Sequence, residues 1–180
     1  MPRFHLTLVA LAMLPLAAAA DTATYKFKWA GSDGYRMDGV MSFDATLLST
    51  RERITHDDLD CFAISGTHEG APIGTWGLAE LLPETTWYLE FDVASESFTL
   101  PNSETAVTQG WNMNGTGNDC GVDGFGFNLG NYAQDICVDN ELVVASQVDP
   151  TAPFPAVRDD GLALPANACP GAVLMMKSGR

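Results

Sequence analysis

Hydrophobic and polar residues alternate along much of this chain with the period of two that is typical of β-strands. Tyr25, Phe27 and Trp29 alternate with Lys26 and Lys28, so one face of this segment is aromatic and the other is charged. A glycine-containing turn over residues 31–34 follows, and residues 35–44 form a second alternating segment. Together they predict an antiparallel hairpin.

Further short segments have strand character. They cover residues 61–65, 73–78, 86–93, 97–100, 107–113, 125–129, 136–138, 141–147 and 172–177. Residues 55–59 instead predict one helical turn, because Thr55 can cap it and Asp58 follows three residues later. The remainder of 66–77 is loop-like, and the proline-rich stretch 149–170 predicts a loop that wraps the surface.

This pattern predicts an all-β protein. Many short strands separated by frequent turn signals favour an antiparallel β-sandwich, with a β-barrel as the alternative. No segment keeps the helical period for long, and no repeat of fixed length occurs.

Residues 1–20 have the layout of a secretory signal peptide. Arg3 gives a basic start, an apolar stretch follows, and Ala18 and Ala20 are the small residues that precede a cleavage site. The apolar stretch is shorter than the roughly 20 residues that a membrane-spanning helix needs. We therefore expect export to the periplasm or the extracellular space, a single domain over residues 21–180, and no integral membrane segment after processing.

Export changes the interpretation of the cysteines. Cys61, Cys120, Cys137 and Cys169 make an even count, and in an oxidising compartment this predicts two disulfides. Three pairings are possible, and we favour Cys120–Cys137 with Cys61–Cys169. The first pair would close a glycine- and asparagine-rich segment, which stabilises the fold by about 3 kcal/mol on chain-entropy grounds.

The net charge of −14 argues against two classes of partner. An acidic surface repels phosphate backbones and anionic lipids, so we expect no nucleic acid partner and no membrane docking through basic patches. We expect a monomer whose partner is a glycan or a cell surface.

The segment 112–124 offers a candidate cofactor site, a weak calcium site. Hard cations prefer oxygen ligands, and several amide and carboxylate side chains occur here on a flexible backbone. The candidate ligands are Asn112, Asn114, Asn118, Asp119 and Asp123. The spacing does not match an EF-hand loop, and the alternative is a long turn in which Gly and Asn residues supply positive φ angles.

Trp76 and two histidines are further candidates. Trp76 stands between Gly74 and Gly77 in a polar stretch, so we expect it to be exposed and to contact a ligand, whereas Trp29, Trp87 and Trp111 fall in phase with core residues. His56 and His68 could serve a metal site or a hydrolase, but no Gly-x-Ser-x-Gly motif accompanies them.

Several short motifs in the first quarter of the mature chain resemble a known group of proteins. They are Tyr25-x-Phe-x-Trp29, Gly34-Tyr35, Asp38-Gly39, Phe43-Asp44 and Ile54-Thr-x-x-Asp58-Leu59. This pattern resembles uncharacterised exported bacterial β-domain proteins, many of which carry a Pro-Glu-Pro sorting tail. That tail is absent here, and the resemblance implies a secreted β-domain without supplying a catalytic residue.

These observations lead to one functional hypothesis and two alternatives. We expect an exported, disulfide-stabilised β-sandwich that binds a ligand or a surface without catalysis. The alternatives are a small secreted hydrolase acting on a polysaccharide or an ester, and a structural or matrix protein.

Overall fold

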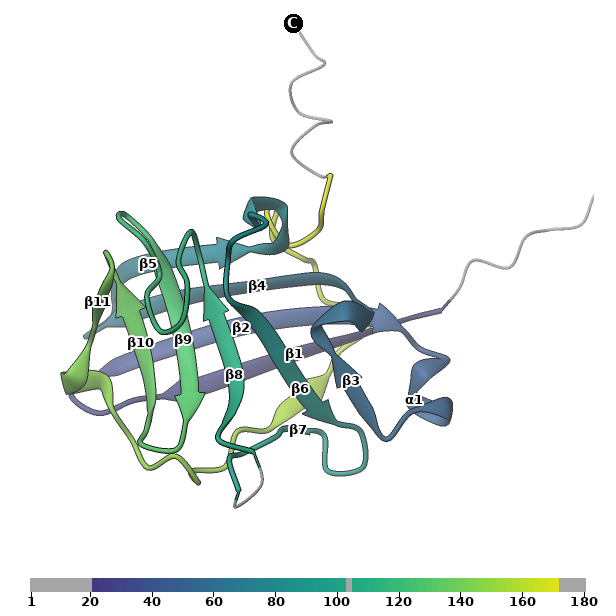
Figure 1. The fold of residues 1–180 in the computed structure, drawn as a ribbon. Helices are drawn as coiled ribbons and strands as arrows, with labels where there is room; N and C mark the ends of the chain where they lie inside the picture. Colours follow the sequence, from purple (N-terminus) through teal and green to yellow (C-terminus); the bar gives the residue numbers. More distant parts are fainter. Residues whose placement is uncertain (1–20, 103–104, 172–180) are drawn as a thin grey trace, which may run out of the picture.

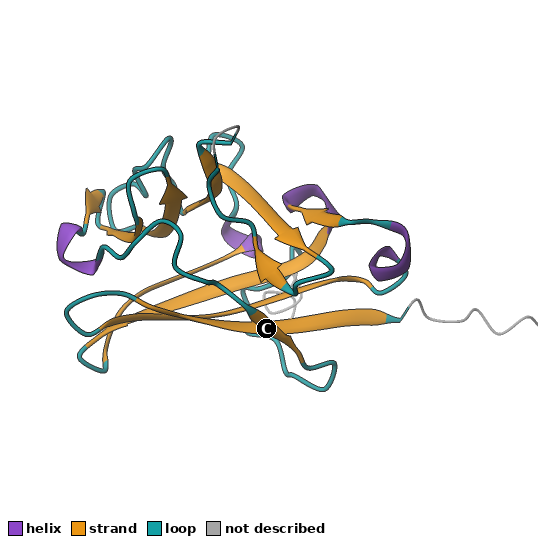
Figure 2. Ribbon diagram, turned by 90° about the horizontal axis from the view of Figure 1, so that it is seen from below, coloured by secondary structure: helices purple, strands orange, loops and turns teal. Residues whose placement is uncertain are grey.

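The computed structural model describes residues 21–102 and 105–171, which form two antiparallel sheets packed face to face (Figures 1 and 2). One sheet has the strand order β12-β1-β2-β4-β5, and the other has the order β11-β10-β9-β8-β6-β3, with β7 paired to β6. Each sheet keeps two separate edge strands, so the fold is a sandwich, as predicted.

The strands are short apart from three long ones in the first sheet. They are β1 (Thr22–Ala30), β2 (Tyr35–Asp44), β3 (Arg53–Thr55), β4 (Leu59–His68), β5 (Ala71–Gly77), β6 (Trp87–Asp92), β7 (Ser97–Phe98), β8 (Val107–Asn112), β9 (Phe125–Gly130), β10 (Gln134–Val138), β11 (Glu141–Leu142) and β12 (Ala156–Arg158). The helical elements are single turns: α1 (Leu47–Thr50), η1 (His56–Asp58), η2 (Leu78–Glu80) and η3 (Val144–Ser146).

Aromatic side chains fill the space between the sheets. The ring of Phe27 packs within 6 Å of the rings of Phe62, Phe98, Trp111 and Phe154, which come from both sheets and from the segment before β12. Gly39 faces Phe27 across the hairpin, and a Cβ at this position would lie 2.1 Å from that ring. The glycine on the apolar face therefore makes room for an aromatic neighbour.

One hydrogen bond joins the two sheets inside this core. The indole Nε1 of Trp29 on β1 donates to Oε1 of Gln134 on β10 at 2.9 Å, and both side chains are buried. The amide of Gln134 in turn donates to the carbonyl of Ala152 at 2.6 Å. Both the oxygen and the nitrogen of the buried Gln134 side chain therefore have hydrogen-bond partners, as burial requires.

The predicted turn at 55–59 is confirmed as η1. The backbone N–H and the hydroxyl of Thr55 both donate to Oδ2 of Asp58, at 2.9 and 3.0 Å. The same carboxylate lies 3.4 Å from the guanidinium of Arg51. These contacts fix the corner at which the chain passes from β3 in one sheet to β4 in the other.

Two local predictions are wrong. Residues 66–77 are not mainly loop, because β4 runs to His68 and β5 starts at Ala71. The predicted strand 141–147 stops at Leu142 and continues as η3, where the hydroxyl of Ser146 donates to the carbonyl of Val143. The short elements α1, β3 and β12 were not predicted, and the candidate strand 172–177 lies outside the described residues.

Candidate functional site

A groove of about 490 Å³ lies on the outer face of the five-stranded sheet. Its floor comes from β1, β2, β4 and β5, and its opposite wall comes from the chain that follows β12. We call residues 159–169 the strap. Its residues Leu162, Pro165, Ala166 and Asn167 line the groove. The volume falls in the range of small-molecule sites in proteins, about 300–1,000 Å³.

The strand register gives the floor two parallel rows of side chains. Lys28 pairs with Asp38, Asp38 with Ser65, and Ser65 with Thr75, so one polar row crosses four strands. The neighbouring row is mostly apolar. It runs through Lys26, Val40, Ala63 and Gly77. A ligand in the groove would therefore meet apolar surface on one side and charged or hydroxyl groups on the other.

Contacts at both ends hold the strap on the sheet. At its start, the N–H of Asp159 donates to the carbonyl of Thr24 at 2.7 Å, and the ammonium of Lys26 lies 2.7 Å from the Asp159 carboxylate. That hydrogen bond from Lys26 holds the pKa of Asp159 below its usual value.

At its end, the strap meets β4 and η2. The N–H of Phe62 donates to the carbonyl of Ala168 at 2.8 Å, and the amide of Asn167 donates to the Glu80 carboxylate at 2.9 Å. The Cys61–Cys169 disulfide closes the same end. Beneath it lies a small second core, in which Cys61, Ala63 and Ala168 are buried.

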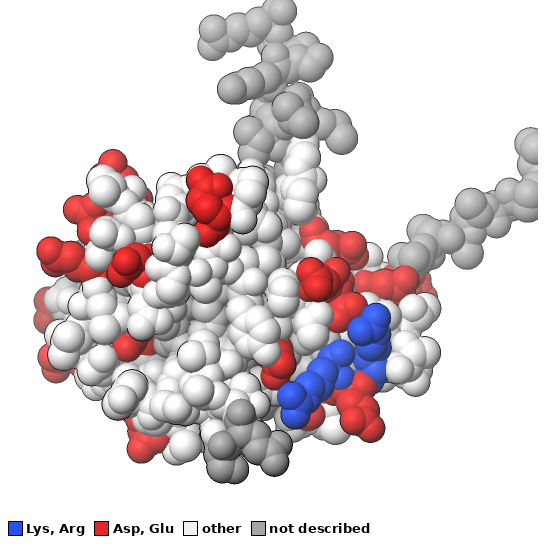
Figure 3. Space-filling model, viewed as in Figure 1, with Lys and Arg blue, Asp and Glu red and all other residues white. Residues whose placement is uncertain are grey.

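Charged side chains of both signs meet at the groove. Two lysines and one aspartate line it, and each lysine has a carboxylate partner, Asp159 for Lys26 and Asp38 for Lys28. Arg36 lies next to Lys28 and Asp38 in a smaller adjoining pocket of about 150 Å³. On the opposite face, Figure 3 shows acidic side chains spread around the rim and one basic patch near α1 and β3. Arg53 is the first residue of β3, and Arg51 lies between α1 and β3.

Trp76 is not exposed, contrary to our prediction. Its side chain is fully buried, with its ring 5.9 Å from that of Phe62 and 5.2 Å from that of Trp87. Trp29 and Trp111 are buried as predicted, and Trp87 is half-buried.

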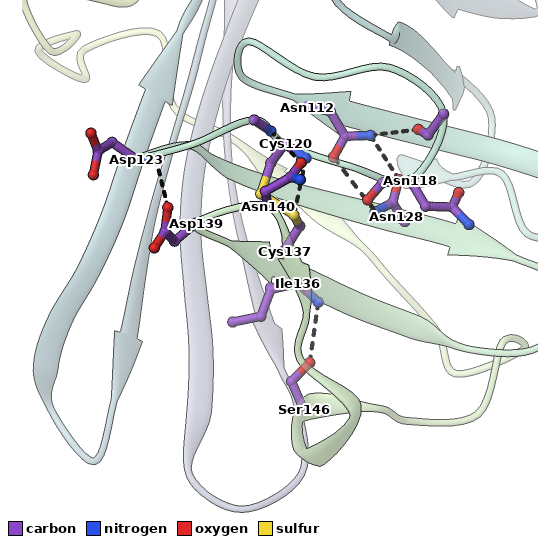
Figure 4. The surroundings of a disulfide bond; sticks show 12 residues. Asn112, Asn118, Cys120, Asp123, Asn128, Ile136, Cys137, Asp139, Asn140 and Ser146 are labelled. Atoms are coloured by element: carbon purple, nitrogen blue, oxygen red, sulfur yellow. Dashed lines mark hydrogen bonds between the residues drawn. A yellow bond between two sulfur atoms is a disulfide. The ribbon is translucent and has the colours of Figure 1, made fainter.

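The four cysteines form the two disulfides that we favoured, Cys61–Cys169 and Cys120–Cys137. The second one attaches the loop 113–124 to the outer face of β10, where both of its cysteines are fully buried (Figure 4). Asn112 and Asn128 anchor the same loop. The amide of Asn112 donates to the carbonyl of Gly117, and that of Asn128 donates to the carbonyl of Asn118.

The candidate calcium ligands are not arranged as one shell. Asn112 is fully buried, and its amide group is hydrogen-bonded to Asn128. In Figure 4, Asp123 lies on the far side of the disulfide and points away from Asn112 and Asn118. The backbone of Asn114 has a φ of 49° and that of Asp123 a φ of 56°, so both serve as turn residues.

Asp119, the fifth candidate, is exposed. Among the described residues, no group of three or more His, Cys, Asp or Glu side chains is placed to hold a metal ion. The alternative interpretation of this segment, a long turn, accounts for its geometry better.

The two histidines lie apart from the groove and have structural surroundings. His56 packs against the rings of Trp87 and Tyr88, and its Nε2 lies 3.7 Å from the Asp57 carboxylate. His68 stacks on Tyr35 with ring centroids 4.0 Å apart. The hydrogen bonds found for the described part of the chain pair neither histidine with a serine.

Comparisons with known proteins give no match: no protein-family model, no curated protein and no solved structure is similar to this chain. The resemblance to exported proteins with sorting tails stays a prediction. Within the described ranges, no helix is long and apolar enough to span a membrane. The case for a function therefore rests on the groove.

Sequence reasoning did not identify the groove residues. The one available signal was the pair Lys26 and Lys28, which share a polar strand face, together with a proline-rich segment long enough to cross it. Neither feature states which strands lie beneath that segment.

Proposed function

We propose that this protein is an exported binding protein that holds a small amphipathic anion in the groove beneath the strap. The observation that carries this proposal is the groove itself, with an apolar row beside a polar row and lysines at its rim. The signal-peptide pattern of residues 1–20 and the two disulfides support export to an oxidising compartment.

The lining favours an aliphatic ligand over a sugar. Val40, Ala63 and Leu162 offer aliphatic surface. Of the lining residues, only Phe27 is aromatic, and its ring is buried between the sheets against Phe62 and Trp111. The groove therefore has no exposed aromatic ring on which a sugar could stack.

The charge pattern favours a carboxylate as the polar end of the ligand. The side chain of Lys28 is 80% exposed, so its ammonium has room for a second partner besides Asp38. Ser65 and Thr75 are exposed in the same row and add hydroxyl donors. A carboxylate at this row would receive charge-assisted hydrogen bonds, which are stronger than those between neutral groups.

Octanoate is a suitable probe, because it combines one carboxylate with an aliphatic chain. Isothermal titration calorimetry with the full chain should show binding of one octanoate per protein, and octylamine should bind more weakly. The substitution Ser65→Phe, at an exposed groove position, should abolish binding by filling the space.

Thr22→Phe is the matched control. Thr22 lies on β1, on the face of the sheet that carries the groove. It is exposed and does not line the groove, so this variant should bind octanoate like the parent protein. Equal binding of octanoate and octylamine, or unchanged binding by the Ser65→Phe variant, would refute the proposed site.

A further inference from the structure

The wall that the strap contributes to the groove depends on a short segment near the end of the described chain. Leu162, Pro165 and Ala166 face the sheet across the groove, and the segment between them and Gly171 contains Cys169. The strap is therefore fixed at its far end by one covalent bond, from Cys169 to Cys61 on β4.

Few non-covalent contacts hold this end within the described residues. They comprise the hydrogen bonds from Phe62 N–H to Ala168, from Ala79 N–H to Asn167, and from Asn167 to Glu80. The apolar contribution is the small cluster around Ala63 and Ala168. Segments with so little buried apolar surface open at much lower free energy than a core strand.

The two disulfides differ in accessibility. Cys120, in the loop 113–124, and Cys137, on β10, are both fully buried. In the other pair, Cys61 is 8% exposed and Cys169 is half-buried, so the Cys61–Cys169 pair is the more exposed of the two. Access of the attacking thiolate to sulfur is one of the factors that set the rate of thiol–disulfide exchange.

We propose that the Cys61–Cys169 disulfide is a redox-sensitive control of ligand binding, which opens the groove when a dithiol reduces it. This inference rests on the proposed function of the groove. A thiolate of the dithiol attacks Sγ of Cys169, the more exposed cysteine of the pair, and Cys61 leaves as a thiolate that takes up a proton.

The second thiol of the dithiol then attacks the dithiol sulfur atom that is bonded to Cys169. This step releases Cys169 as a free thiol. The S–S bond of the protein has gained two electrons and two protons, and the dithiol has become a disulfide. With the covalent bond broken, the end of the strap is held only by its hydrogen bonds and the small cluster, so it opens and the groove loses one wall. The sandwich itself stays folded, because its aromatic core lies on the other face of the sheet.

The test is a titration of the folded, full chain with dithiothreitol. Alkylation of free thiols followed by mass spectrometry identifies which pair is reduced. Hydrogen exchange at the amides of Phe62 and Ala79 reports on the strap, since both donate to its carbonyls. Octanoate affinity is measured on the oxidised and the selectively reduced protein.

We expect Cys61–Cys169 to be reduced first, exchange at both amides to accelerate, and octanoate affinity to fall at least about tenfold. Reduction of Cys120–Cys137 first, or unchanged exchange at both amides after reduction of Cys61–Cys169, would overturn the inference. Equal octanoate affinity of both forms would also overturn it while leaving the proposed function intact. If the oxidised protein does not bind octanoate, the proposed function fails, and the exchange data still decide whether the disulfide controls the strap.

Discussion

The ammonium of Lys28 lies 2.7 Å from the carboxylate of Asp38 across the β1–β2 pair, at the rim of the groove. The two side chains are 80% and 57% exposed, so this ion pair adds little to the stability of the fold. Its location suggests a different role, since the pair presents a cation to the space in which a ligand would lie.

Replacing Lys28 should therefore change binding rather than stability. We expect Lys28→Ala to weaken octanoate binding about tenfold, because it removes one charge-assisted hydrogen bond. The melting temperature should stay within the error of the measurement. Calorimetric titration and a thermal melt of the same sample check both expectations.

Arg53→Ala provides the control for the loss of one positive charge. Arg53 lies on β3 of the other sheet and pairs with Glu90, away from the groove. If both variants lose the same affinity, the overall charge of the protein governs binding and the local role of Lys28 is wrong.

Trp76 leads to a prediction about stability rather than binding. Because its ring is fully buried between Phe62 and Trp87, we expect Trp76→Ala to lower the free energy of unfolding by about 3–5 kcal/mol. Chemical denaturation followed by circular dichroism measures this loss. Leu82→Ala, at an exposed neighbouring position, should cost far less. A stable Trp76→Ala variant would mean that the surrounding rings close over the cavity.

The error at Trp76 shows where sequence patterns mislead in this fold. Gly66 and Gly74 suggest a loop, yet both lie on paired strands. Each leaves space for the ring of Phe125, because a Cβ would lie 2.4 Å from that ring at Gly66 and 2.7 Å at Gly74. A glycine that receives an aromatic ring and a glycine that permits a turn look alike in sequence.

The predictions that succeeded depend on local alternation. Tyr25, Phe27 and Trp29 are all buried, since a strand with one covered face places every second residue in the core. The groove could not be predicted in this way. Its floor depends on the register that joins Lys28 to Thr75 across four strands, and its wall depends on where the strap crosses them.

The loop 113–124 leads to a prediction about calcium. The amide of Asn112 is engaged with Asn128 and with the carbonyl of Gly117, so binding a cation there would break existing hydrogen bonds. We expect millimolar calcium to leave the melting temperature unchanged, with magnesium chloride at equal ionic strength as the control. A rise with calcium alone would restore the site predicted from the sequence.

Asn112→Ala should, in contrast, destabilise the loop. It removes the bonds to Gly117 and Asn128 and leaves the buried side-chain oxygen of Asn128 without this donor, at a cost of about 1–3 kcal/mol. Denaturation measures the loss. Asn118→Ala is the matched control, because the Asn118 side chain is exposed and only its backbone carbonyl takes part in the loop contacts.

Asp135 should make stability depend on pH in an unusual direction. Its side chain is 6% exposed, Oδ2 accepts a hydrogen bond from Gln147, and Oδ1 is buried without a hydrogen-bond partner among the described residues. Burial raises the pKa of Asp135 from 3.8 to about 6, and the hydrogen bond from Gln147 opposes this only in part. Above this pKa, the folded protein holds a buried charge that the unfolded chain exposes to water.

The buried charge therefore lowers the free energy of unfolding by its full amount at pH values above the folded pKa of about 6. This loss of stability shrinks as the pH falls through that pKa, and it is absent below the unfolded pKa of 3.8. Asp135→Asn removes the charge, so we expect it to stabilise the protein at pH 8 by about 1–3 kcal/mol and to have little effect at pH 4.

Asp149→Asn is the matched control, and we expect it to change the free energy of unfolding in the opposite direction. Asp149 is exposed, and hydrogen bonds from the side chain and the backbone of Thr151 hold its pKa below the usual value. Its charged form is favoured by folding, so the substitution should destabilise the protein at neutral pH, and this effect should disappear in acid. Urea denaturation of both variants across this pH range measures the two profiles. A pH-independent effect of Asp135→Asn would show that the pKa of Asp135 is the same in the folded and the unfolded protein, and it would contradict the prediction.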